Sequence, residues 1–248
     1  MPRLFVTREQ ASGDRLSVDG DAARHLAGPL RVRPGELILV VDDGGVEHGV
    51  RVDAVERARV DGTVVWSRPA SGEPRLRLSV IQALIREIDE VVAGLAEVGV
   101  AGIHPVVAER SVSRPDPERA GSRHRRWAGI AREAAELAHR AAIPSVHALT
   151  TLDSALAELP AGTRILACTV EADAPLARAE IDPTRPAALV IGPEGGFTHA
   201  EVDLLLAAGA ERVHLGPRVL PARLAGVVAA GLLLGRAGDL DTALPAAP

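Results

Sequence analysis

Hydrophobic and polar positions follow two different patterns along the chain, and the change comes near residue 70. Before it, short β-branched runs near 36–41, 46–55 and 63–66 are separated by Asp-Asp-Gly-Gly and Asp-Gly. Such pairs accept the positive φ angles of tight hairpin turns. We therefore expect a small β-barrel or sheet over residues 1–68. The segment SRPASGEPR contains two Pro and two Ser, and it predicts a linker at 69–75.

After residue 75, strand-like apolar runs alternate with segments of helical spacing. The run LRLSVIQAL at 76–84 predicts a buried strand, and apolar residues three or four positions apart over 86–100 predict a helix. The same reasoning predicts further strands at 102–109, 163–170, 187–192 and 212–216, and further helices at 123–141, 198–210 and 222–237. This alternation is typical of an α/β fold in which helices cover both faces of a mostly parallel sheet.

An unusual turn, Gly-Pro-Glu-Gly-Gly at 192–196, separates one apolar run from the next helical segment. Glycine lets a ligand approach the backbone closely, and the start of a helix offers free N–H donors. Thr198 is followed three residues later by Glu201, which predicts a capping box and a helix that begins there. By itself the turn also fits a purely structural bend, and it is neither a Walker loop nor a Rossmann fingerprint.

Two more predicted strands end in polar or glycine-containing turns. Cys168-Thr169-Val170-Glu171 follows one, and Leu215-Gly216-Pro217 follows the other. If these strands neighbour the run at 187–191, their carboxyl ends meet at one edge, where parallel α/β sheets bind ligands. We expect such an edge to hold an adenosine largely through main-chain groups. Cys168 is interpreted as a small buried hydrophobe rather than a nucleophile.

Composition narrows the functional classes. The chain has 248 residues and a formal charge of -5, which argues against a globally basic nucleic-acid coat but not against a local basic patch. A single cysteine excludes a disulfide framework and a multi-cysteine metal site, and the sequence predicts no metal. The start, MPRLFVTREQ, has no apolar core of a signal peptide, and no run of about 18 uncharged apolar residues occurs. We expect a cytoplasmic protein with no membrane contact.

The stretch LVIGPEGGFTHAEVDLL at 189–205, followed by VHLGPRVL at 213–220, closely resembles the signature of the bacterial small-subunit (16S) ribosomal RNA uridine-N3 methyltransferase family. Residues 25–45, 96–114 and 133–146 also resemble family segments, so the resemblance covers almost the whole chain. It implies a SPOUT-type parallel sheet with a trefoil knot over 76–242, an exception to the rule that chains do not thread. It also implies a preceding PUA-like RNA-binding β-barrel over 1–68, S-adenosyl-L-methionine as methyl donor, small-subunit ribosomal RNA as partner, and a homodimer.

Together with the strand-end argument, the resemblance implies a set of cofactor-binding residues. They are Thr169, Glu171, Ile191, Gly192, Pro193, Gly195, Gly196, Leu215, Gly216, Pro217, Val219 and Leu220. Because a side chain at Gly195 would take the space of the ligand, we expect Gly195→Val to abolish donor binding.

The catalytic candidates are Arg110, Arg140 and Glu194. Uridine N3 must lose a proton before it attacks the methyl group, so a base or cations that stabilise the uridine anion are needed. Arg110, Arg140 and Arg218 supply positive charge at strand and helix ends, and Glu194 supplies a carboxylate. Each also has a structural interpretation: a solvated Arg110, an Arg140–Glu136 pair within a helix, and a Glu194 that accepts N–H bonds from its own turn.

Arginine clusters predict RNA contact. The candidates are Arg24, Arg31 and Arg33 in the first part of the chain, and Arg114, Arg123, Arg125 and Arg126 in the segment RPDPERAGSRHRRW. Counterion release favours RNA binding by a local arginine cluster even though the net charge of the chain is negative. An arginine-rich solvated loop explains the segment equally well. With two Phe, two Trp and no Tyr, phosphate contact is favoured over base stacking.

The chain departs from the pattern of the resembled family at several places. Leu-Pro-Ala-Arg-Leu-Ala at 220–225 replaces the usual Leu-Arg-Thr-Glu-Thr-Ala, and Ala93, Gly94 and Ala96 replace polar residues of the family. Leu137 and Ala138 replace a Gln and a Ser. The resemblance places the lost side chains beside the donor and target pocket. This leaves two alternatives open: a non-catalytic or retargeted relative that binds RNA with or without the donor, and a ribose methyltransferase.

Overall fold

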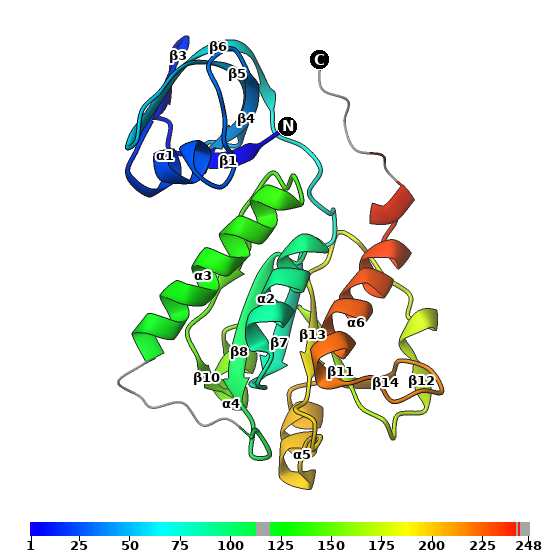
Figure 1. The fold of residues 1–248 in the computed structure, drawn as a ribbon. Coiled ribbons are helices and arrows are strands. Elements are labelled where there is room, and N and C mark those ends of the chain that lie inside the picture. Colours follow the sequence, from blue (N-terminus) through cyan, green and yellow to red (C-terminus); the bar gives the residue numbers. More distant parts are fainter. Residues whose placement is uncertain (113–119, 242, 244–248) are drawn as a thin grey trace. The chain divides into compact units, whose positions relative to one another are not determined.

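The computed structural model describes residues 1–112, 120–241 and 243, and the chain divides into two compact units (Figure 1). The first unit comprises Met1–Glu73 together with Ala135–Ala142, and the second comprises Pro74–Ala134 together with Ile143–Pro248. Residues 135–142 belong with the first unit because the Glu136 carboxylate accepts the backbone N–H of Phe5 at 3.1 Å. Ala135 also packs with Phe5 and Val41. The hydrophobic pattern gave no indication of this contact.

The first unit contains a six-stranded sheet in the order β1-β4-β5-β6-β3-β2. Its elements are β1 (Arg3–Val6), β2 (Ala11–Ser12), β3 (Arg15–Asp19), α1 (Gly20–Ala27), β4 (Leu37–Asp42), β5 (Val46–Val55) and β6 (Arg59–Pro69). β1 runs parallel to β4, and the other neighbours are antiparallel. The runs predicted at 36–41 and 46–55 form β4 and β5, and the third is longer than expected because it pairs along nearly all of β5.

Bulges and one close packing contact help to curl this sheet into the half-barrel seen in Figure 1. The register between β5 and β6 shifts at Gly49/Val50 and again at Val52/Ala54, and such shifts bend a strand. At Gly49 a Cβ would lie 2.2 Å from the ring of Trp66, so only glycine fits beneath that indole.

The second unit is built on an eight-stranded sheet in which all pairings among the described strands are parallel. The order is β10-β8-β7-β13-β11-β14-β12, with β9 beside β8. The strands are β7 (Leu78–Ala83), β8 (Gly102–Val107), β9 (Ser145–Val146), β10 (Thr150–Thr151), β11 (Arg164–Cys168), β12 (Ala174–Pro175), β13 (Ala187–Ile191) and β14 (Glu211–His214). The predicted parallel α/β sheet is confirmed, whereas β9, β10 and β12 are too short to leave a hydrophobic pattern.

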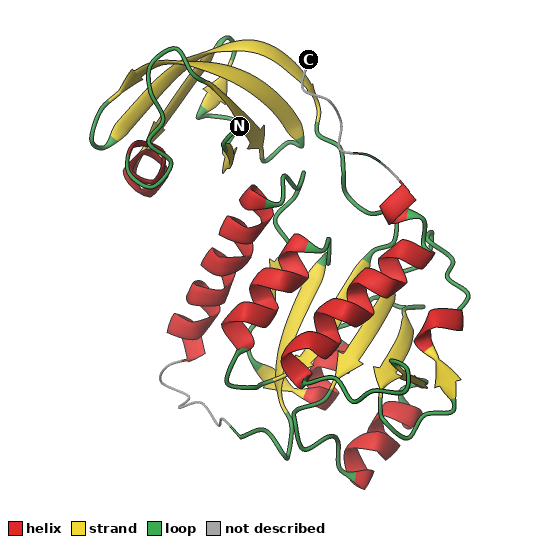
Figure 2. Ribbon diagram, turned by 45° about the vertical axis from the view of Figure 1, so that its right-hand side comes forward, coloured by secondary structure: helices red, strands yellow, loops and turns green. Residues whose placement is uncertain are grey.

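Helices cover both faces of this sheet (Figure 2). On one face lie α2 (Ile88–Glu97), α3 (Ala120–Leu137) and α6 (Ala222–Arg236), and on the other lie α4 (Leu152–Ala157) and α5 (His199–Ala207). Short 3-10 turns occur at Leu176–Arg178 and Asp239–Asp241. Val80 packs into the hydrophobic core on one face of the sheet, and its neighbour Ile81 packs into the core on the other face. Because both faces of β7 are buried, the strand is a continuous apolar run in the sequence.

The parallel sheet with helices on both faces agrees with the architecture that the resemblance implies. The trefoil knot that the resemblance implies stays a prediction. Among the described residues, no helix combines the length and the apolar character that a membrane span requires.

Candidate active site

Three strand ends meet at one edge of the large sheet, as the sequence predicted. β11 lies between β13 and β14, so Cys168 has Ile191 on one side and Val213 on the other. The backbone N–H of Thr169 donates to Val213 O at 2.9 Å, which carries the pairing one residue past the end of β11. The turns that follow these strands therefore share the same edge.

These turns enclose a cavity of about 430 Å³. It is lined by Arg110, Cys168, Thr169, Val170, Glu171, Ile191, Gly192, Pro193, Glu194, Gly195, Gly196, Phe197, Val202, Arg212, His214, Leu215, Gly216, Arg218, Val219, Leu220, Pro221, Ala222 and Ala225. Of the residues that the resemblance implied for the cofactor, only Pro217 is not among them. Their role in binding stays a prediction.

Two glycines give the cavity wall its shape. Gly196 has φ +67 and Gly216 has φ +102, a region that residues with a Cβ rarely adopt. The N–H of Gly196 donates to Pro193 O at 2.9 Å and closes the first turn. The N–H of Gly216 donates to His214 Nδ1 at 3.1 Å and closes the second. Both turns line the cavity, and the binding through main-chain groups that the sequence argument expects stays a prediction.

The predicted capping box fixes the start of α5. Thr198 Oγ1 accepts from the N–H of Glu201 at 3.3 Å, and Glu201 Oε2 accepts from the N–H of Thr198 at 2.8 Å. The second carboxylate oxygen of Glu201 accepts the N–H of Glu109 at 2.8 Å, just beyond β8. Glu201 therefore fixes the end of the glycine-rich loop and links it to the segment that follows β8, two strands away from β13 in the sheet.

Arg110 braces the same loop. Its Nη1 donates to Gly195 O at 2.9 Å and to Phe197 O at 3.4 Å. A Cβ at Gly195 would lie 3.2 Å from the Cβ of Arg110, so the missing side chain makes room for this arginine. The clash with the ligand expected for Gly195→Val stays a prediction, and a larger residue there also crowds Arg110.

The polar groups of the cavity differ in their surroundings. Thr169 Oγ1 is buried and has no hydrogen-bond partner among the described residues. Burial raises the pKa of the Cys168 thiol to about 12, so the thiol stays protonated at neutral pH and fits the inert role expected for it. Glu194 lies on the exposed part of the loop.

The sequence argument missed two hydrogen-bonding side chains of the cavity, Arg212 and His214. They are two positions apart on β14 and flank the buried Val213, so the period-2 pattern of RVH could have placed them on one face. Because His214 Nδ1 accepts from the N–H of Gly216, the neutral imidazole carries its proton on Nε2. Nε2 is then a donor.

Arg140 does not line the cavity, in contrast to the catalytic role expected for it. It is buried in the first unit, where its Nε and Nη2 donate to the Glu73 carboxylate, the former at 3.2 Å. The same carboxylate accepts the N–H groups of Ala141 and Ala142 at 2.9 and 3.2 Å. Arg140 and Glu73 therefore hold together two chain segments that are far apart in sequence.

The replacements at 220–225 and those on α2, which both depart from the resembled family, lie in different environments. Pro221 and Ala222 line the cavity, so these two replacements remove polar side chains from its wall. The replacements on α2 do not face the cavity, contrary to expectation: Ala96 is fully buried in the core, and a Cβ at Gly94 would lie 2.9 Å from Val227 on α6. Small residues on α2 instead allow the close approach of α6.

The residues expected to bind RNA have varied environments. Arg31, Arg33 and Arg125 are exposed, Arg123 is half-buried, and Arg114 lies outside the described residues. Arg24 forms an ion pair with Asp21, and Arg126 forms one with Asp89 at 2.5 Å. Asp89 also accepts from the indole N–H of Trp127 at 3.0 Å, so Arg126 has a structural partner between α2 and α3.

Comparison with known proteins agrees with this geometry. Residues 72–234 match the RNA methyltransferase domain family, which defines the class of the protein. Over 236 residues the chain is 33% identical to ribosomal RNA small subunit methyltransferase E of Mycobacterium bovis, covering 92% of this chain and 89% of that protein. The chain belongs to the ribosomal RNA small subunit methyltransferase E family. The enzyme of that name from Bacillus subtilis is 26% identical over 235 residues, covering 89% of this chain and 91% of the other.

Solved structures give the same relationship. Ribosomal RNA small subunit methyltransferase E of Neisseria gonorrhoeae, solved bound to S-adenosyl methionine, matches with a TM-score of 0.84 and 28% identity. The match covers 93% of this chain and 95% of that one. A protein of Legionella pneumophila solved in complex with the cofactor also has a TM-score of 0.84, with 25% identity over 95% of this chain and 97% of the other.

Proposed function

We propose that this chain binds S-adenosylmethionine in the cavity of the second unit and methylates N3 of a uridine in small-subunit ribosomal RNA. The observation that carries the proposal is the meeting of three strand-end turns around one cavity of about 430 Å³. A cavity of this size suits a nucleoside-bearing ligand. Membership of the family and the two relatives solved with the cofactor support the same ligand.

The residues present fit this cofactor. Ile191, Leu215 and Leu220 offer apolar surface to an adenine ring, and the two glycine turns offer main-chain groups. The buried Thr169 Oγ1 has no hydrogen-bond partner among the described residues, and a polar group of the ligand can form that hydrogen bond. When bound, S-adenosylmethionine supplies an activated methyl group on a sulfonium.

Two arginines and one imidazole donor of the cavity suit a uridine target. Arg212, Arg218 and the Nε2–H of His214 favour the anionic form of the ring, which lowers the free energy needed to remove the N3 proton. Glu194 is the carboxylate of the glycine-rich loop, and we assign to it the acceptance of that proton. Arg110 is assigned a positioning role, because its guanidinium already holds Gly195 O.

We assign RNA binding to the exposed arginines and to the β half-barrel of the first unit. The side chains of Arg31, Arg33 and Arg125 are exposed, so they are available to phosphates. Arg31 has φ 50 in a loop, a conformation that non-glycine residues adopt rarely and often at binding sites.

We also propose a homodimer that acts in the cytoplasm, where ribosomal subunits are assembled. Several large apolar side chains near the cavity are exposed, including Val170 at 74% and Val219 at 77%. On α6, Leu224 and Val228 are four residues apart and also exposed, so they share one helix face. Coverage of this apolar surface by a second copy explains the exposure, and size-exclusion chromatography with light scattering tests it.

Methyl transfer tests the proposed function directly. Purified protein is incubated with undermethylated small subunits and labelled S-adenosylmethionine, and the modified nucleotide is located by mass spectrometry. We expect a methyl group on N3 of a single uridine. Donor binding without methyl transfer supports the non-catalytic alternative, which is based on the loss of polar side chains at 221–224. A methyl group on a ribose oxygen supports the ribose methyltransferase.

A pair of threonine variants tests the location of the donor. Thr169→Val removes the unpartnered hydroxyl at nearly constant volume, so we expect the Kd for the donor to rise about tenfold while the fold is unchanged. Thr150→Val, on β10 and outside the cavity lining, is the matched control and is expected to bind normally. Equal Kd values for the two variants would remove Thr169 from the donor site.

A further inference from the structure

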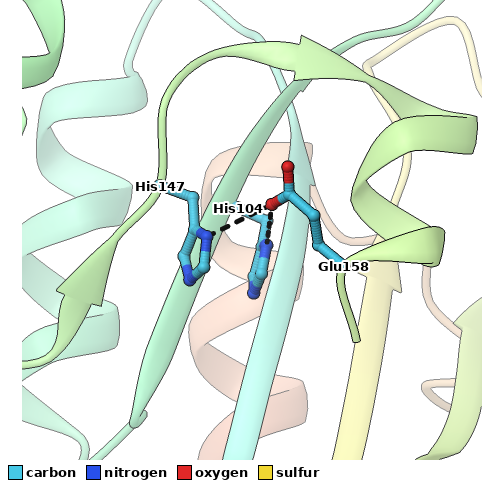
Figure 3. A group of neighbouring side chains, drawn as sticks. All are labelled: His104, His147 and Glu158. Carbon is cyan, nitrogen blue, oxygen red and sulfur yellow. Dashed lines mark ion pairs between the residues drawn. The ribbon is translucent and has the colours of Figure 1, made fainter. Parts of the chain in front are cut away.

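A second group of chemically active side chains lies away from the cavity. His104 is on β8, His147 follows β9, and Glu158 is the C-cap of α4, and the fold brings the three together (Figure 3). None of the three lines the cavity. Because they come from three separate elements of the second unit, no sequence motif joins them.

The spacing of their polar atoms matches that of ligands around one metal ion. Glu158 Oε2 lies 3.3 Å from Nδ1 of His147 and 3.9 Å from Nδ1 of His104. One ligand atom from each residue lies within 4.8 Å of the others. Ligands that bind Zn²⁺ at about 2.1 Å in a tetrahedral arrangement are about 3.4 Å apart, so small side-chain movements suffice.

His104 needs a partner that no described residue provides. Its ring is buried, with 3% of the residue exposed, and Nδ1 has no hydrogen-bond partner within normal distance. Leaving a buried polar atom unsatisfied is unfavourable, which indicates a ligand at this position.

The two imidazoles stack in the structure, with ring centroids 3.7 Å apart and planes inclined by 18°. The two Nδ1 atoms therefore lie side by side, and both face the same carboxylate oxygen of Glu158 (Figure 3). A shared ion requires the ring of His147 to turn. This is feasible because about a third of the His147 side chain is exposed, at 35%, whereas His104 stays fixed in the core.

We propose that His104, His147 and Glu158 form a site for one divalent transition-metal ion, with zinc as the representative ion. Two imidazole nitrogens and one carboxylate oxygen are a zinc ligand set that leaves a further position for water. A proton shared between His147 and Glu158 satisfies that pair but leaves Nδ1 of His104 unpartnered, whereas a metal ion satisfies all three. The bound ion ties the end of α4 to β8.

Metal titration of the full-length chain tests the site. Protein purified in the presence of chelator is titrated with Zn²⁺ in competition with a chromogenic chelator, and with Co²⁺, whose visible absorption reports the coordination. We expect one ion per chain. His147→Asn and Glu158→Gln change the two exposed ligands and leave buried His104 in place, so the fold is retained, and each is expected to raise the metal Kd at least tenfold. His25→Asn, in α1, is the matched control with normal binding.

Each outcome of these titrations either supports or overturns the proposed metal site. Stoichiometric binding that weakens in both ligand variants but not in the control, together with a Co²⁺ spectrum of low coordination number, supports the site. Equal Zn²⁺ affinity in all variants places the ion elsewhere, and no binding at micromolar Zn²⁺ leaves a carboxylate–imidazole cluster; either result overturns the proposal. Circular dichroism and the Tm of each variant in chelator confirm that the fold is unchanged. No readout depends on methyl transfer.

Discussion

Replacement of Arg110 tests the idea that the glycine-rich loop is held in its binding conformation before the donor arrives. Arg110→Ala removes the hydrogen bonds from Nη1 to Gly195 O and Phe197 O, at 2.9 and 3.4 Å. The loop keeps its capping box with Glu201, so it loses one of its two anchors. We expect weaker donor binding with no loss of global stability.

The magnitude follows from the two contacts. A hydrogen bond from a charged donor contributes about 1.5–3 kcal/mol, and exposure places this one at the lower end. The second contact, at 3.4 Å, is too long to add much. If the ordered conformation of the loop is destabilised by about 1.4 kcal/mol, the fraction of molecules competent to bind falls about tenfold. The apparent Kd for the donor then rises by up to the same factor. Arg110→Lys retains one donor, so a rise of about threefold is expected.

Isothermal titration with S-adenosylmethionine measures these Kd values. Arg57→Ala, an exposed arginine in a turn of the first unit, controls for the loss of one positive charge. The kcat for methylation of small subunits at saturating donor is measured in parallel. A positioning role predicts that kcat changes much less than Kd, because donor excess restores the ordered loop.

Two results refute this reasoning. An unchanged donor Kd in Arg110→Ala shows that the loop does not need the arginine. A fall in kcat of a hundredfold or more with an unchanged Kd shows that the guanidinium acts on the target nucleotide instead, the catalytic role first expected from the sequence.

Three further predictions concern stability and reactivity. Glu73→Ala removes one carboxylate that pairs with the buried guanidinium of Arg140, so the free energy of unfolding in urea is expected to fall by about 3 kcal/mol; a fall below about 1 kcal/mol contradicts a supporting role for the pair. Cys168, whose pKa is raised to about 12 by burial, is expected to react with iodoacetamide at pH 8 on the order of a thousandfold more slowly than in the denatured chain, and rapid alkylation of the native chain opposes that burial. Hydrogen bonds from Arg164 hold the pKa of Glu211 below its ordinary value of 4.5, so this pair stabilises the fold above about pH 4.5 and that contribution is lost as the pH falls further. Urea unfolding between pH 7 and 3.5 measures it: Arg164→Met is expected to reduce the dependence on pH, and equal curves for the two proteins argue against the linkage.

Local patterns in the sequence determined much of this protein. The spacing of apolar residues predicted β4, β5 and the alternating strands and helices of the second unit, because burial on one or two faces leaves a period in the chain itself. Thr198 and Glu201 predicted the start of α5 because both halves of a capping box lie within one turn. The Gly-Pro-Glu-Gly-Gly turn was recognisable because its residues act through backbone conformation.

The tertiary structure alone decided which distant residues meet. Gly195 adjoins Arg110, which is 85 residues away, and Arg140 pairs with Glu73, which is 67 away. His104, His147 and Glu158 meet only because β8, β9 and α4 lie side by side. Such contacts depend on strand order and on helix packing. Because these are set by the burial of whole faces, they leave no regular sequence spacing between the residues that meet. The sequence therefore determined the elements and the loop at the active-site edge, and the packing of those elements determined which side chains meet there.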